Sequence, residues 1–256
     1  MKRIKLAFCV VLTVLTVIGV CGCMDTGKEK NGYSNADYSA AIEGYLSDKY
    51  SLSFKVDSLG GVYGTSDNST VKAWCHSVDG SYANIRFMAE VNKENLRIVK
   101  DNYLHIVSAG MISDKLCNNH DGVAAYSIVE SSTYSTADSI LELNEYLAGL
   151  DTYFVTTHFF VKDSESMSVN DYVNMVYSIG ESAKGLNLQD LCIVVWFVDE
   201  VSSDFAKIFS ETSVDKLYDA FLSSDLVNCH ATIQLTEDEI TTKHETIQSS
   251  IEKGVR

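Results

Sequence analysis

The sequence predicts an α+β protein: a helix on an antiparallel meander, followed by a unit in which helices and strands alternate. Three observations indicate this class. Apolar and polar side chains alternate between residues 52 and 91, apolar residues recur at helical spacing elsewhere, and Leu191–Val198 is an uninterrupted apolar run. Alternation is typical of a strand with one buried face, whereas a continuous apolar run favours a strand covered on both faces.

Helix starts are indicated by a recurrent capping box, in which Ser or Thr is followed three residues later by an acidic residue. The five pairs are Ser34–Asp37, Ser135–Asp138, Ser168–Asp171, Thr212–Asp215 and Thr236–Glu239. Each precedes apolar residues spaced three and four apart, which predicts an amphipathic helix. A sixth helix, without the box, is expected at about 102–117. Because negative charge is favourable at a helix N-terminus, we interpret the four aspartates, Asp37, Asp138, Asp171 and Asp215, as structural rather than catalytic.

The strands predict the division of the chain. The expected strands are 52–56, 71–75, 85–91, 152–161, 191–198 and 227–235. The first three, with glycine and Asx turns between them, predict the meander, and the last alternates as a strand near a sheet edge does. We expect an α+β unit at 37–131 and an alternating unit at 135–256, joined at 131–134. One continuous domain is the alternative.

The N-terminus has the plan of an export signal. Lys2, Arg3 and Lys5 precede an apolar run at 6–20. Fifteen helical residues span about 22 Å, which is short of the ~30 Å hydrocarbon core of a membrane. We therefore expect residues 1–22 to be a signal peptide rather than a transmembrane helix.

The end of this segment, Val20-Cys21-Gly22-Cys23, resembles the bacterial lipobox: an aliphatic residue, a variable residue, a small residue and the lipidated cysteine. The resemblance implies a diacylglyceryl lipid on Cys23, an anchor in the membrane and a location on the outer face of the cell membrane. Residues 23–36 are polar and are expected to form a flexible tether. The chain is similar to Gram-positive cell-surface lipoproteins of unknown function. An uncleaved signal anchor and a secreted protein are the alternatives.

The net charge of the chain excludes one class of partner. The 256-residue chain has a net charge of −15, and removal of residues 1–22 takes away three basic and no acidic residues, which gives −18. Such a charge repels a phosphate backbone, so no nucleic-acid partner is expected.

Four cysteines remain beside Cys23, namely Cys75, Cys117, Cys192 and Cys229. Their apolar neighbours favour buried thiols, with Cys75–Cys229 as the alternative disulfide.

No motif in the chain indicates a reaction. Asp25-Thr26-Gly27 spells half of an aspartic-protease site, but the second aspartate triplet is missing and this one lies in the tether. Ser213-x-x-Lys216 resembles a serine acyl-enzyme motif without its K-T-G companion. Adjacent Cys–His pairs on strands point to opposite faces, and the acidic loop at 162–166 lacks calcium-loop spacing. We assign no catalytic residue, cofactor or metal ligand.

Three functions therefore stay open. The first is a binding or interaction module displayed outside the membrane, with envelope proteins or glycans as partners, and exposed tyrosines suit such contacts. The tyrosines in or near expected loops and strand ends are Tyr33, Tyr63, Tyr82, Tyr126 and Tyr134. The second is a hydrolase with a site assembled from distant residues, which predicts a cleft with a perturbed carboxylate or histidine. The third is a small solute-binding lipoprotein, which predicts two similar lobes.

Overall fold

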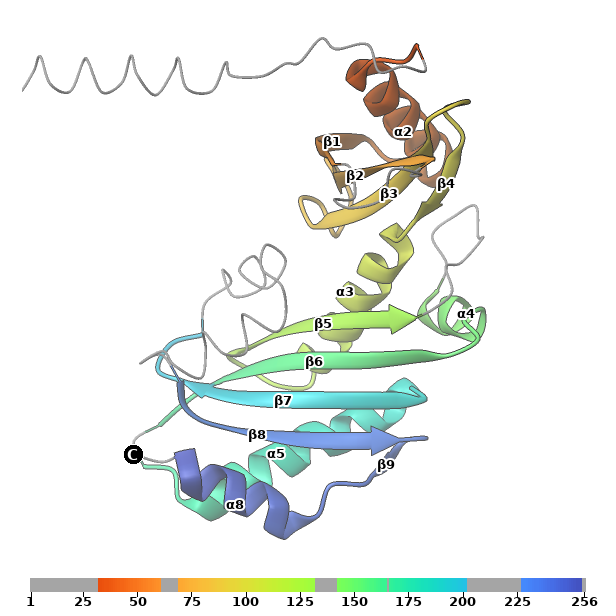
Figure 1. Ribbon diagram of the computed structural model, residues 1–256. Helices are drawn as coiled ribbons and strands as arrows, with labels where there is room; N and C mark the ends of the chain where they lie inside the picture. Colours follow the sequence, from red (N-terminus) through yellow and green to blue (C-terminus); the bar gives the residue numbers. More distant parts are fainter. Residues whose placement is uncertain (1–31, 61–68, 132–141, 165, 202–226, 255–256) are drawn as a thin grey trace, which may run out of the picture.

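The computed structural model describes residues 32–60, 69–131, 142–164, 166–201 and 227–254. These residues form helices and two mostly antiparallel sheets, so the α+β class is confirmed. The four-stranded sheet lies above the five-stranded one in Figure 1, and helix α3 runs from the first to the second. The expected signal peptide, Cys23 and most of the tether lie outside the described residues.

The first sheet is an antiparallel meander in the order β1-β2-β3-β4. Its strands are β1 (Phe54–Gly60), β2 (Thr70–Ser77), β3 (Arg86–Asn92) and β4 (Ile98–Asp101). Helix α2 (Asn35–Tyr50) covers one face and buries Tyr38, Ile42 and Leu46 against it. The alternation in the sequence predicted β1, β2 and β3. It missed β4, which is only four residues long.

The change from one sheet to the other comes earlier in the chain than the sequence predicted. Helix α3 (Tyr103–Cys117) matches the expected sixth helix and packs against β5 (Val123–Ser131). β5 pairs with β6 in the second sheet, although the expected boundary places 123–131 in the first unit. The change of sheet therefore falls between Asp101 and Val123. The sequence did not predict β5 because apolar and polar residues alternate only weakly along it and most of its side chains are half-buried.

The second sheet has the order β5-β6-β7-β8-β9. Its other strands are β6 (Tyr153–Lys162), β7 (Asp190–Val198), β8 (Val227–Thr236) and β9 (Glu239–Ile240). β6 and β7 are parallel, and the other pairs are antiparallel. β7 is central, as its apolar run predicted. The helices of this part are α4 (Leu143–Ala148), α5 (Val169–Ala183), the 3₁₀ turn η1 (Lys184–Leu186) and α8 (His244–Gly254).

The capping boxes have different outcomes. At Ser34 and Ser168 the hydroxyl accepts a hydrogen bond from the backbone N–H of the aspartate three residues later. The carboxylate of that aspartate accepts a hydrogen bond from the backbone N–H of the serine, so both boxes are confirmed. The boxes at 135–138 and 212–215 lie outside the described residues. The box at Thr236 is wrong: Thr236 ends β8, and the next two residues have φ of 50° and 63°. Two consecutive positive φ values make the tight turn of a β8–β9 hairpin rather than a helix start.

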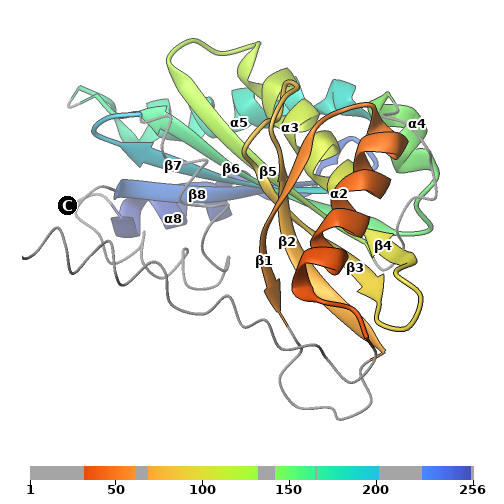
Figure 2. The same ribbon diagram turned by 90° about the horizontal axis from the view of Figure 1, so that it is seen from above.

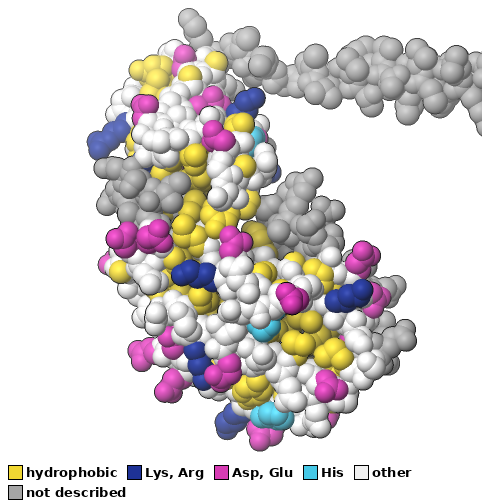
Figure 3. Space-filling model, turned by 180° about the vertical axis from the view of Figure 1, so that it is seen from behind, with side chains coloured by type: hydrophobic (Ala, Val, Ile, Leu, Met, Phe, Trp, Pro, Cys, Tyr) yellow, Lys and Arg dark blue, Asp and Glu magenta, His cyan; other side chains and the backbone are white. Residues whose placement is uncertain are grey.

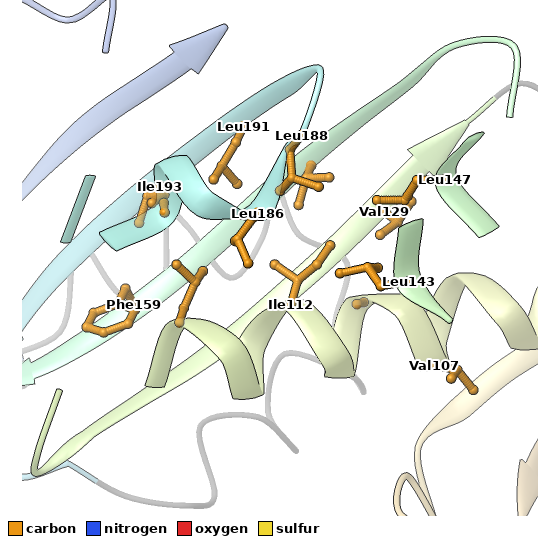
Figure 4. Packing of buried hydrophobic residues seen from close by; sticks show 14 of the residues in the cluster. Val107, Ile112, Val129, Leu143, Leu147, Phe159, Leu186, Leu188, Leu191 and Ile193 are labelled. Carbon is orange, nitrogen blue, oxygen red and sulfur yellow. The ribbon is translucent and has the colours of Figure 1, made fainter. Parts of the chain in front are cut away.

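One apolar core continues through both parts of the molecule. Side chains of α3, β5, β6, β7, α4 and η1 point into the same space in Figure 4, for example Ile112, Val129 and Phe159. Figure 2 shows that α3 and α5 lie on the same side of the second sheet.

The four cysteines beyond Cys23 are free thiols, so the Cys75–Cys229 alternative is wrong. Among the described helices, none is long and apolar enough to cross a membrane.

Candidate functional site

The first sheet has an open face opposite α2. Because side chains alternate along β2 and β3, Ala73, Cys75 and Phe87 point into the core, whereas Trp74 and Met88 point away from it. We call this surface the Trp74 face. It consists of Lys55, Asp57, Lys72, Trp74, His76, Arg86, Met88, Glu90 and Lys100. The Trp74 side chain is 48% exposed, which is unusual for the largest apolar side chain at the middle of a strand.

On one side of Trp74 lies a row built around Asp57. Its Oδ1 atom is 2.8 Å from His76 Nδ1, and its Oδ2 atom is 3.5 Å from Arg86 Nε. The Arg86 guanidinium carbon lies 5.4 Å from the centre of the Trp74 ring, a distance at which cation and ring attract each other. Asp57 therefore holds the Arg86 guanidinium beside the Trp74 indole, at one edge of the exposed apolar surface.

On the other side of Trp74 lies a row built around Glu90. Its Oε1 atom is 3.3 Å from Lys100 Nζ and 3.6 Å from Lys72 Nζ. The Glu90 side chain is only 9% exposed, while the two lysines are 33% and 39% exposed. The carboxylate is thus covered by the lysines, and the row presents ammonium groups to solvent.

The Trp74 face differs in charge from the rest of the chain. It carries four basic side chains and two carboxylates, whereas the whole chain has a net charge of −15. An exposed indole flanked by cations offers an apolar plane and ion-pairing groups within a few strand spacings. This combination suits a ligand that has both a flat or ring-shaped part and negative charge.

The tyrosines that suggested an interaction surface do not gather on it. Tyr33 packs against Tyr38, Tyr82 donates to Asp114, and Tyr126 lies beside the second sheet's buried cluster. Tyr63 and Tyr134 lie outside the described residues. The sequence did contain a signal for Trp74, because the alternation in β2 places this tryptophan with Lys72 and His76 on the polar face.

A second arrangement lies where β6 and β7 end. Asp163 follows β6 and Asp199 follows β7, and the Asn228 amide donates to both carboxylates at 2.7 Å. The Tyr172 hydroxyl also donates to Asp163, at 2.7 Å. The two carboxylates are thus bridged by one amide. Over the described residues, no group of three or more His, Cys, Asp or Glu side chains is arranged to hold a metal ion.

The histidines and cysteines of the strands lie as alternation predicted. Cys75 is buried and His76 lies on the Trp74 face, and Cys229 and His230 likewise point to opposite faces of β8. Burial raises the pKa of the Cys75 and Cys229 thiols to about 12, which keeps both protonated at neutral pH. Because each cysteine and its neighbouring histidine point to opposite faces of their strand, neither adjacent pair forms a Cys–His couple.

Buried polar groups connect the first sheet to α3 and α4. Asp101 accepts from the Tyr50 hydroxyl at 2.8 Å and from Lys49 Nζ at 3.1 Å. One helical turn further on, His105 Nδ1 is 2.6 Å from the Tyr146 hydroxyl. Burial lowers the pKa of His105, which favours the neutral ring. These groups satisfy one another inside the protein, and we interpret them as structural.

The second sheet also has its own packing on the face away from α5. Trp196 lies between His158 and His230, with ring centres 6.0 Å and 5.1 Å away, and its Nε1–H donates to His158 Nδ1. Trp196 is fully buried. Burial lowers the pKa of His158 to about 4. The two sheets are therefore unlike each other, whereas the solute-binding alternative predicted two similar lobes.

Comparison with known proteins gives one informative likeness. No protein-family model matches the chain, and no curated protein matches it either. The fold is similar to the crystal structure of a DUF5037 family protein from Ruminococcus gnavus ATCC 29149, with a TM-score of 0.57 over 84% of this chain and 98% of that one. The two sequences are 14% identical, so the likeness extends to the fold alone.

Proposed function

We propose that this protein is a lipid-anchored extracytoplasmic binding module that uses the Trp74 face to hold an anionic glycan of the cell envelope. One observation carries the proposal. Trp74 is 48% exposed between a row centred on Asp57 and a row centred on Glu90, and the lysines and arginine of these rows outnumber the carboxylates. On an otherwise acidic protein, such a surface favours a partner that is itself negatively charged.

A glycan fits this surface better than a folded protein for two reasons. The indole is a flat apolar platform on which the apolar face of a sugar ring can lie, and the surrounding ammonium groups can pair with its carboxylates or phosphates. Trp74 and its cross-strand neighbour Met88 offer a small apolar area, whereas a protein interface usually has a larger cluster of apolar anchors.

The experiment compares two exposed aromatic residues in the full-length lipidated protein. We expect Trp74→Ala to weaken binding to isolated acidic envelope glycans at least tenfold, measured by biolayer interferometry on the protein in lipid nanodiscs. The matched control is Tyr45→Ala, because Tyr45 is 39% exposed on α2, away from the Trp74 face. Wild-type binding should weaken as salt increases, since exposed ion pairs are screened.

Other outcomes would overturn parts of this proposal. Equal binding by the Trp74→Ala and Tyr45→Ala proteins would remove the Trp74 face as the site. Cross-linking on intact cells that joins Lys72 or Lys100 to a single envelope protein would replace the glycan with a protein partner.

The anchor has its own test. We expect Cys23→Ser to release the protein from the membrane fraction, because the proposed diacylglyceryl group supplies about 0.8 kcal/mol for each buried CH₂. Cys21→Ser, two residues earlier, is the matched control and should leave the protein membrane-bound. Retention of the Cys23→Ser protein in membranes would show that another part of the chain holds it there.

A further inference from the structure

A cavity lies where the first sheet meets α3 and β5. Its volume is about 170 Å³, and its lining is mainly apolar, with Ile85 from the first sheet's side, Ile106 and Ala109 from α3, and Ala125 from β5. Seen from behind in Figure 3, hydrophobic side chains gather between the upper and lower parts of the molecule. An apolar cavity of about 150 Å³ in another protein holds benzene, so this one has room for a single aromatic ring.

Tyr82 forms one wall of the cavity and is held in two ways. Its hydroxyl donates to Asp114 Oδ2 at 2.9 Å, and its ring lies directly against Gly110 of α3. A Cβ at position 110 would overlap that ring, so only glycine permits this approach. Glycine inside a helix is less favourable than alanine. Its presence here places an aromatic ring beside the cavity.

The polar side chains that line the cavity already form hydrogen bonds within the protein. The Ser113 hydroxyl donates to the Ala109 carbonyl or Ser127, and the Ser127 hydroxyl also meets Thr157 at 2.8 Å. Asp114 is the charged residue of the lining, and a carboxylate can accept several hydrogen bonds in addition to the one from Tyr82. Because Asp114 is exposed, a ligand meets an apolar space with a carboxylate acceptor at its solvent-facing edge.

We propose that this cavity binds a small aromatic molecule with one hydroxyl group, of the size and chemistry of a phenol. The ring fills the space between Ala109, Ala125 and the Tyr82 ring, and the hydroxyl donates to Asp114. The site is separate from the Trp74 face, because its lining comes from the opposite, α3-covered side of the first sheet. The proposal stands independently of the glycan-binding function.

The test uses the full-length protein with phenol and benzene as probes. In methyl NMR titrations we expect phenol to shift the Ala109 and Ala125 methyl signals and to leave that of Ala40, which is exposed on α2, unchanged. Phenol should bind about threefold to tenfold more tightly than benzene, since its hydroxyl can donate to the exposed Asp114 carboxylate.

Two variants separate the cavity from the surface. Ala109→Leu fills the space and should lower phenol affinity at least tenfold, while Ala40→Leu makes the same change on an exposed helical position and should have no effect. Ala125→Val is a milder filling variant if Ala109→Leu does not fold. Absence of methyl shifts with phenol, or equal affinity in the Ala125→Val and Ala40→Leu proteins, would overturn the proposal.

Discussion

The chain contains two tryptophans, and each stands at the middle of a strand in a different sheet. Trp74 of the first sheet is 48% exposed, with a guanidinium against its ring. Trp196 of the second sheet is fully buried and stacked between two histidines. The same side chain is therefore solvent-exposed in one sheet and part of the packing in the other.

The difference follows from how the two sheets are covered. The first sheet packs α2 and the start of α3 on one face and exposes the charged Trp74 face. The second sheet is apolar on both faces of its central strand, because β7 contributes Ile193 and Phe197 to one core cluster and Val194 and Trp196 to another. We infer that the second sheet is the stable platform and that the first carries the binding surface.

The largest effect should come from removing the buried indole. Trp196→Ala is expected to lower the free energy of unfolding by about 3–5 kcal/mol, because a large cavity is left and the hydrogen bond to His158 is lost. Trp74→Ala should change it by less than about 1 kcal/mol, since the side chain is half in solvent. Urea denaturation followed by circular dichroism compares the two. Similar losses in both variants would contradict the division between platform and binding surface.

A comparison of ion pairs extends the same contrast. The side chains of Lys49 and Asp101 are 8% and 3% exposed, so Asp101→Asn leaves a buried ammonium without its counter-ion and should cost about 3 kcal/mol or more. The Glu181–Lys184 pair is exposed, and Glu181→Gln should cost less than about 0.5 kcal/mol. Thermal unfolding would measure both. An Asp101→Asn protein as stable as the wild type would mean that Lys49 reaches water.

Acid should destabilise the second sheet through His158. Burial lowers the pKa of this ring to about 4 in the folded protein, against about 6.5 in an unfolded chain. The unfolded state therefore binds the proton first, and stability that is complete above pH 6.5 falls as pH decreases to about 4, by up to about 3 kcal/mol. Burial also lowers the pKa values of His105, His120 and His230, which adds to the same trend.

The pH effect is tested by the slope of unfolding free energy against pH. His158→Gln should flatten the slope between pH 6.5 and 4, because it removes the ring whose pKa burial lowers. An unaltered slope in the His158→Gln protein would assign the acid sensitivity to other groups.

Much of this fold is predictable from local patterns in the sequence. Alternation identified β1, β2 and β3, and the continuous apolar run identified β7, because side-chain period and burial are directly linked in strands. β4 and β5 were missed for physical reasons: β4 is held by three paired residues, and β5 is only partly buried. The pairing partner of β5 depends on contacts with β6 that local pattern does not contain.

The candidate site was predictable only in part. The sequence placed Trp74, Lys72 and His76 on one polar strand face, but the rows around Asp57 and Glu90 depend on the register of four strands. The cavity needs Tyr82 of the β2–β3 connection to contact α3, and the hydrogen bond that joins them spans 32 residues of sequence. Long-range geometry of this kind has no local signal.

The smallest effects concern the helix caps, which compare a confirmed box with the one that proved to be a turn. Ser168→Ala removes the acceptor for the Asp171 N–H at the start of α5 and should cost about 1 kcal/mol in unfolding free energy. Thr236→Ala should cost less, because Thr236 ends β8 and its hydroxyl only donates to Asp190 at the strand's edge. Chemical denaturation of the two variants resolves the difference. A larger loss for Thr236→Ala would contradict this order. It would mean that the hydrogen bond from Thr236 to Asp190 stabilises the protein more than the capping box of α5 does.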